Sequence, residues 1–313
     1  MRVVSLIASA TEMVCALGCE DRLVGRSHEC DFPPSVKRLP QLTSPKFSLD
    51  GSSAQIDERV KELLRSALAV YRVDADRLAE LRPDVIVTQS QCDVCAVSLR
   101  DVEEAVCGIL PSRPRIVSLE PNTLDDVWRD LARVAEALDV RERGAELIAR
   151  SRARLAEVSA RVAGLPRPTV ACIEWVEPLM AAGNWMPTLV ELAGGRSLFG
   201  EAGKHSPWMT FDELAARDPE IIVALPCGYD LARTAEDMPL LARHAEWPKL
   251  RAVRDGRVFV TDGNQYFNRP GPRLVDSLEI LAEIFHPREF APAHRGDAWQ
   301  PWPAPSQSQH AED

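Results

Sequence analysis

Patterns typical of β-strands alternate with patterns typical of helices along most of this chain. In the first third, short runs rich in Val and Ile, such as RVVSLIAS (2–9) and DVIVTQ (84–89), alternate with amphipathic runs such as SSAQIDERVKELLRSALAVY (52–71). The alternation restarts at TVACIEWV (169–176) and continues to PRLVDSLEILAEIF (272–285). Strands separated by helices are typical of a parallel sheet covered by helices on both faces. The sequence therefore predicts an α/β fold.

A long helical stretch separates the two alternating halves. Thr123 is expected to cap a helix with one apolar stripe, and the Ala- and Arg-rich run RERGAELIARSRARLAEVSARVAGL (141–165) follows it. We therefore predict two Rossmann-like lobes with parallel sheets, joined by one long rigid helix. The last residues are rich in Pro, Ser, Gln and His, which is typical of disorder. The predicted parts are an N-terminal lobe at 1–122, linking helices at 123–166, a C-terminal lobe at 167–290 and a disordered tail at 291–313.

Charge and hydropathy exclude two classes of partner. Lys and Arg number 37 against 47 Asp and Glu, so the net charge of −10 repels a phosphate backbone, and no basic run offsets it. A membrane-spanning helix needs about 20 consecutive apolar residues, and no stretch approaches that length. We therefore expect a small-molecule ligand, with no nucleic-acid partner and no membrane span.

The N-terminus faintly resembles a signal peptide, because Arg2 precedes an apolar run. That run is interrupted by Ser5, Ser9 and Thr11. Ser9 to Glu12 also match a capping box, in which the Ser9 hydroxyl accepts from the Glu12 backbone N–H and the carboxylate reaches back. We therefore interpret these residues as part of the fold rather than a leader, and predict a cytoplasmic protein.

The loops that follow the predicted strands are the candidate ligand site, because ligands of open parallel sheets bind beyond the carboxyl ends of the strands. Two lobes facing each other across such loops would form a cleft for a small molecule. The loops are ASATE, SHECDFPP, TQSQCDVC and EPNT in the first lobe, and EWVEPLMAAGNWMP, PCGYD and DGNQYFNRPGP in the second.

These loops also carry a family resemblance. RVVSLIASATEMVCALGCEDRLVGRSHECDFPP (2–34) resembles the opening of class III substrate-binding proteins of ABC importers, in particular those that carry cobalamin. The resemblance continues through LAELRPDVIVTQ (78–89), TLVELAGGRSLFGEAG (188–203) and VFVTDGNQYFNRPGPRLVDSLEILA (258–282), and covers residues 2 to 286. It departs from the family near Asn268, where a carboxylate that docks onto the importer is missing, so docking to an ABC importer is not expected.

The resemblance implies a cobalamin, or a related corrinoid or tetrapyrrole, held between the lobes. Flat macrocycles pack well on aromatic rings. The implied stacking residues are Trp175, Trp185, Tyr266 and Phe267, and the opposite wall would include Ser9, Gln89 and the loops SHEC and CDVC. Arg269 would either pair with an acidic group of the ligand or cap the following helix. Because no catalytic motif is present, these residues favour a binding protein over an enzyme.

Four further side chains suggest an alternative function. His28 and Cys30 follow one predicted strand, Cys92 and Cys95 follow another, and the first strand is expected to lie between them. The strand ends would then be about 10 Å apart, because each strand step is about 4.8 Å.

The four residues could hold zinc or an iron–sulfur cluster in a redox protein or enzyme. Cys92 and Cys95 alone could form a redox dithiol, and His28 or a cysteine could approach a corrinoid cobalt. Simple packing of the thiols remains the other interpretation.

Overall fold

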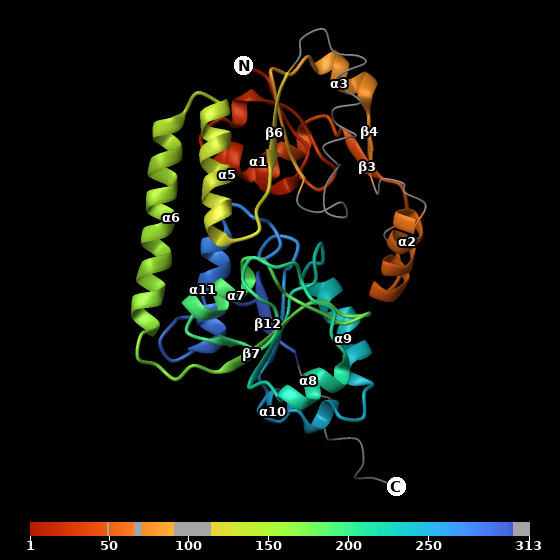
Figure 1. Cartoon of the computed structure of the whole chain (residues 1–313), viewed down its shortest axis with the longest axis vertical. Helices are drawn as coiled ribbons and strands as arrows, with labels where there is room; N and C mark the ends of the chain where they lie inside the picture. The colour runs from red at the N-terminus through yellow and green to blue at the C-terminus, as the bar shows by residue number, and fades with distance from the viewer. Residues whose placement is uncertain (49, 66–70, 91–113, 303–313) are drawn as a thin grey trace. The chain divides into compact units, whose positions relative to one another are not determined.

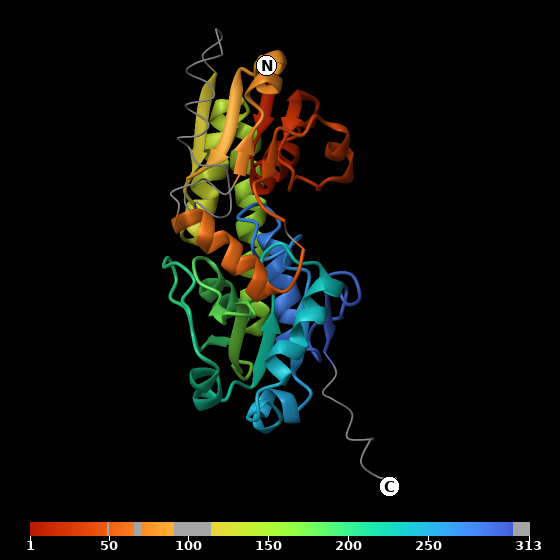
Figure 2. The same cartoon turned by 90° about the vertical axis from the view of Figure 1, so that its right-hand side faces the viewer.

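The structure is a computed structural model that describes residues 1–48, 50–65, 71–90 and 114–302 (Figure 1). Its contacts divide the chain into two compact units. Unit 1 comprises Met1–Gly51, Gln55–Ala153 and Arg269–Arg273, and unit 2 comprises Ser52–Ala54, Arg154–Asn268 and the residues from Leu274 onward. Each unit is built round its own sheet, as the two views in Figures 1 and 2 show. The predicted α/β class is therefore confirmed, although the sheet of unit 2 also contains antiparallel strands.

The main sheet of unit 1 is parallel. Its strands are β1 (Val3–Ser5), β2 (Leu23–Arg26), β5 (Val85–Gln89) and β6 (Arg115–Leu119), and they pair in the order β2-β1-β5-β6. The first strand thus lies between β2 and β5, as the sequence predicted. All residues of β1 and β5 are buried, which explains their Val- and Ile-rich composition. A small antiparallel pair, β3 (Thr43–Pro45) with β4 (Tyr71–Val73), was not predicted.

The helices α1 (Ala8–Ala16), α3 (Ala75–Leu81) and α5 (Leu124–Ala137) pack against strands of this sheet. The same part of the chain contains α2 (Ser53–Arg65), the start of α6 (Arg141–Val162) and short 3-10 turns at Glu20–Arg22 and Pro34–Arg38. Caps were predicted for α5 at Thr123 and for α1 at Ser9. Thr123 caps α5 as predicted, because its side chain accepts from Asp126 N while the Asp126 carboxylate accepts from Thr123 N. The predicted capping box at Ser9 is wrong: α1 begins at Ala8, so Ser9 already lies inside its first turn.

Unit 2 has a mixed sheet. Its strands are β7 (Thr169–Trp175), β8 (Met180–Ala181), β9 (Arg196–Ser197), β10 (Ile221–Ala224), β11 (Val258–Thr261) and β12 (Trp299–Pro301). The order is β12-β11-β10-β7-β8, with β9 also paired to β7, and β7, β10 and β11 are parallel. The helices are α7 (Met186–Leu192), α8 (Phe211–Arg217), α9 (Leu231–Ala242), α10 (Arg251–Arg254) and α11 (Leu274–Phe285), with a 3-10 turn at Trp247–Lys249.

The unit boundaries differ from the predicted ones in two places. The helix α6 belongs to unit 1 as far as Ala153 and to unit 2 from Arg154, so it does not form a part of its own. The segment Arg269–Arg273, predicted within the second lobe, belongs to unit 1. The reason for this second difference is a set of ion pairs that this segment makes with α1, described below.

The segment 291–302 is ordered, contrary to the predicted disordered tail. Residues Trp299–Pro301 form β12, which pairs antiparallel with β11. The Trp299 ring is buried, and its Nε1 donates to a carboxylate oxygen of the buried Glu283 at 2.8 Å. One buried tryptophan and one buried carboxylate therefore anchor a segment that is poor in aliphatic residues. Residues 303–313 lie outside the described part of the chain.

Candidate ligand-binding site

The loop after β2 fixes one ring nitrogen of His28. The His28 backbone N–H donates to Thr43 Oγ1 at 3.0 Å, and His28 Nδ1 lies 2.7 Å from the same oxygen. The ring also packs against Tyr71, with 5.0 Å between the ring centroids. Burial and the nearby charge of Arg26 lower the pKa of His28 to about 4, so its imidazole is neutral at neutral pH. The other nitrogen, Nε2, is buried without a hydrogen-bond partner.

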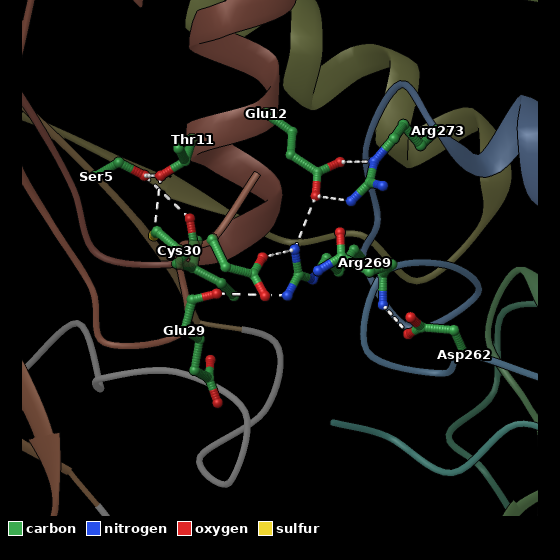
Figure 3. Close-up of polar contacts among 11 residues, drawn as sticks. Ser5, Thr11, Glu12, Glu29, Cys30, Asp262, Arg269 and Arg273 are labelled. Carbon is green, nitrogen blue, oxygen red and sulfur yellow. Dashed lines mark hydrogen bonds and ion pairs between the residues drawn. The ribbon is translucent and has the colours of Figure 1, made fainter. Parts of the chain in front are cut away.

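Cys30, in the same loop, is a buried and protonated thiol. Thr11 Oγ1 donates to Cys30 Sγ at 2.9 Å (Figure 3). Burial raises the pKa of Cys30 to about 11, although this hydrogen bond opposes the shift. Within the described ranges, no group of three or more His, Cys, Asp or Glu residues is placed to hold a metal ion. Cys92 and Cys95 lie outside those ranges, so the four-residue metal site stays a prediction.

Glu12 and two arginines form a buried ionic cluster in unit 1 (Figure 3). The Glu12 carboxylate accepts from Arg269 Nη1 at 3.1 Å and from Arg273 Nε and Nη2 at 2.9 and 2.6 Å. Arg269 Nη1 also binds Asp31 Oδ1 at 2.6 Å, and the Arg273 guanidinium lies 3.8 Å from the Phe32 ring centroid. In the structure, carboxylates of the protein bind the Arg269 guanidinium, and the predicted contact of Arg269 with a ligand stays a prediction.

The two polar residues predicted for the wall of unit 1 are buried at strand ends. Gln89 is the last residue of β5, and Ser9 lies in the first turn of α1, directly after β1. Both side chains are almost completely inaccessible. Ser9 Oγ has no hydrogen-bond partner, because Ser9 lies inside α1 and does not cap it. A role for either residue in ligand binding stays a prediction.

In unit 2, three aromatic residues follow three neighbouring parallel strands, and we call them the aromatic edge: Trp175, Tyr229 and Tyr266. Trp175 ends β7 and is half-buried; its ring centroid lies 5.3 Å from that of Tyr229, which follows β10 and is itself buried, so that Tyr229 supports the Trp175 ring from behind. Tyr266 follows β11 and is also half-buried. Because β11, β10 and β7 are adjacent and parallel, their carboxyl ends lie along one side of the sheet. Tyr229 was missed as a candidate, although its loop PCGYD was recognised by its place after a strand.

Hydrogen bonds fix the loops that carry the aromatic edge. Trp175 Nε1 donates to the Glu177 carbonyl at 3.1 Å. The Asn264 N–H donates to the Tyr229 carbonyl at 3.0 Å, which ties the loop after β11 to the loop after β10. The Asn268 side-chain amide donates to the carbonyls of Leu225 and Gly263 at 2.8 and 3.0 Å and joins the same two loops. Asn268 therefore has a structural role at the position where the importer-docking carboxylate was expected.

Trp185 and Phe267, also predicted as stacking residues, are buried. Trp185 Nε1 donates to the Phe267 carbonyl at 2.7 Å, and the Phe267 N–H donates to Ser277 Oγ at 3.0 Å. Phe267 is completely inaccessible, and its φ of 62° places it in the left-handed region. Both rings contribute to packing in the structure, and a stacking role for either of them stays a prediction.

Comparisons with known proteins identify the family of the chain. The family model described as "Periplasmic binding protein" matches residues 3–265. The chain is 24% identical over 287 residues to a vitamin B12-binding protein of Photorhabdus laumondii, covering 90% of this chain and 87% of that protein. An uncharacterised ABC transporter substrate-binding lipoprotein of Bacillus subtilis is 20% identical over 299 residues, covering 92% and 81%.

Solved structures show the same fold. A periplasmic heme-binding protein from Pseudomonas aeruginosa superimposes with a TM-score of 0.69 at 23% identity, covering 91% of this chain and 92% of that one. The periplasmic vitamin B12-binding protein of Vibrio cholerae gives 0.65 at 18% identity, covering 91% and 96%. Among the described residues, no helix has the length and apolar character to cross a membrane. The match over residues 3–265 shows that the chain belongs to the periplasmic binding protein family of substrate-binding proteins.

Proposed function

We propose that this chain binds cobalamin, or a closely related corrinoid or tetrapyrrole, as its ligand. The observation that carries the proposal is the aromatic edge of unit 2, because it gathers large rings at the carboxyl ends of parallel strands, where this type of sheet binds ligands. The names of the relatives support the same ligand class, since they include vitamin B12-binding and heme-binding proteins.

The physical basis of the proposal is the contact between flat rings. A corrin or porphyrin presents a broad apolar face, and aromatic side chains bury a large area with few rotatable bonds. The hydrogen bond of Trp175 Nε1 to the Glu177 carbonyl and its contact with Tyr229 hold the Trp175 ring before a ligand arrives. Little side-chain entropy is then lost on binding, which favours affinity.

The experiment is a titration of the protein with cyanocobalamin, followed by the quenching of tryptophan fluorescence and by the corrin absorption bands. Trp175→Ala is compared with Trp302→Ala. Trp302 is a suitable control because it is partly buried in the same unit but lies away from the carboxyl ends of the strands. Its backbone N–H donates to the Val258 carbonyl at the amino end of β11.

We expect the wild-type protein to show saturable binding and Trp175→Ala to lose about tenfold in affinity, which equals about 1.4 kcal/mol. Trp302→Ala should bind like the wild type, although its free energy of unfolding should be lower. Absence of saturable binding by the wild type would reject the ligand class. An equal loss in both variants would reject the role of the aromatic edge.

A further inference from the structure

The two ring nitrogens of His28 differ in their surroundings. Nδ1 contacts Thr43 Oγ1, whereas Nε2 is buried without a hydrogen-bond partner. The side chain is 14% exposed, and Glu29 Oε1 lies 3.9 Å from Nε2, beyond hydrogen-bond distance. Buried polar atoms in native proteins nearly always have a partner, so an orphaned one calls for an explanation. An unseen ligand atom is one such explanation, and an imidazole nitrogen is a good ligand for cobalt, iron or zinc.

The strand pair β3–β4 holds the ring from two sides. Thr43, at the start of β3, accepts from the His28 backbone N–H and contacts Nδ1, while Tyr71, at the start of β4, packs against the ring. When Nδ1–H donates to Thr43 Oγ1, the lone pair is on Nε2. Metal-binding histidines are commonly oriented in this way, by a hydrogen bond from the nitrogen that does not bind the metal. The β3–β4 strand pair therefore orients Nε2 as a ligand.

We propose that His28 Nε2 is an axial ligand to the cobalt of a bound corrinoid. The inference rests on the proposed function and adds a bond between the protein and the metal of its ligand. In aquacobalamin the cobalt carries an exchangeable water. The cobalt–oxygen bond breaks, the water leaves, and the Nε2 lone pair forms the cobalt–nitrogen bond, with no electron or proton transferred. Because Nε2 is buried in the structure, the proposed bond requires the side chains packed over it to move when the corrinoid binds.

The test compares two corrinoids that differ at the exchangeable position. Aquacobalamin can exchange its water for an imidazole, whereas cyanocobalamin keeps its cyanide. The proteins are the wild type, His28→Ala and a control, His205→Ala, whose ring is exposed in unit 2 with Nδ1 near the Ser206 carbonyl. Absorption spectra of the bound corrinoid report axial ligation, and the titration reports affinity.

We expect bound aquacobalamin to show the band shift of an imidazole complex with the wild type and with His205→Ala. His28→Ala should lose the shift and bind aquacobalamin at least about tenfold more weakly, while its affinity for cyanocobalamin stays unchanged. Free imidazole added to His28→Ala should restore the shift. Thr43→Val should weaken aquacobalamin binding by about 10- to 100-fold, the usual effect of losing the group that orients a metal ligand.

Four results would overturn the inference, and they are distinguishable. A shift that persists in His28→Ala would show that another group is the ligand. An equal loss of affinity for both corrinoids would show that His28 contributes shape alone. If both corrinoids bind the wild type without a shift, the axial bond is excluded while the proposed function stands; if neither binds, both proposals fail.

Discussion

Replacing Glu12 by Gln should destabilise unit 1 more than the loss of an exposed ion pair does. Glu12 is 3% exposed and accepts three hydrogen bonds from Arg269 and Arg273, whose side chains are 8% and 13% exposed. Gln keeps the shape, but it removes the negative charge and turns an amide N–H₂ toward a guanidinium. Breaking a buried pair from one side costs about 3–5 kcal/mol, because the remaining charge stays buried. Since the Gln oxygen still accepts from one arginine, we expect the lower end, about 3 kcal/mol.

The assay is thermal and urea unfolding of the whole chain, followed by circular dichroism. About 3 kcal/mol corresponds to a fall in the midpoint temperature of about 6–12 °C for a unit of this size. The matched control is Glu136→Gln, which removes an exposed carboxylate paired with Arg141 and should leave the midpoint almost unchanged. If Glu12→Gln shifts the midpoint no more than Glu136→Gln does, the cluster does not stabilise the unit and our reasoning is wrong.

Three further predictions concern pH, thiol chemistry and the C-terminal strand. The pKa of His28 is lowered to about 4 in the folded chain, below the ordinary 6.5, so the unfolded chain takes up the proton first. The contribution of His28 to the free energy of unfolding should therefore fall, by up to about 3 kcal/mol, as the pH drops from about 6.5 to 4, while the neighbouring Glu29, whose pKa burial raises to about 7, acts in the opposite direction. Urea midpoints across this range should depend less on pH in His28→Gln; an unchanged slope would contradict the shift. Cys227 is exposed whereas Cys30 and Cys172 are buried with raised pKa values, so iodoacetamide at neutral pH should label Cys227 before Cys30 and Cys172, as measured by peptide mass spectrometry. Early labelling of Cys30 would show that its loop opens. Trp299→Ala should lower the free energy of unfolding by about 3–5 kcal/mol, because it empties a buried site and leaves Glu283 without one donor; a loss below about 1 kcal/mol, as at exposed sites, would show that β12 is not anchored this way.

The sheets and most helices could be predicted because their patterns are local. Val- and Ile-rich runs bounded by turn residues gave the parallel strands, and the Thr123 cap of α5 depends on a residue three positions away. The Ser9 capping box failed because its Glu12 has partners 257 and 261 residues later in the chain, which no local pattern reveals. β12 was missed for a similar reason, since its anchor is a single contact between Trp299 and Glu283.

The candidate site was predictable in its location rather than in its individual side chains. The rule that ligands bind beyond strand ends identified the loops that carry His28, Trp175, Tyr229 and Tyr266. The sequence did not show which aromatic rings turn inward, so Phe267 was predicted to be exposed although it is fully buried. The predicted cytoplasmic location also stays a prediction, and cell fractionation is its test.

The most direct test of the central claim is isothermal titration calorimetry of the unmodified chain with cyanocobalamin, repeated with hemin and with a ferric siderophore. The account predicts saturable one-to-one binding of cyanocobalamin with a Kd in the low micromolar range or tighter, and weaker binding of the siderophore. No saturable heat with cyanocobalamin, or binding of the siderophore tighter than that of either macrocycle, would contradict it.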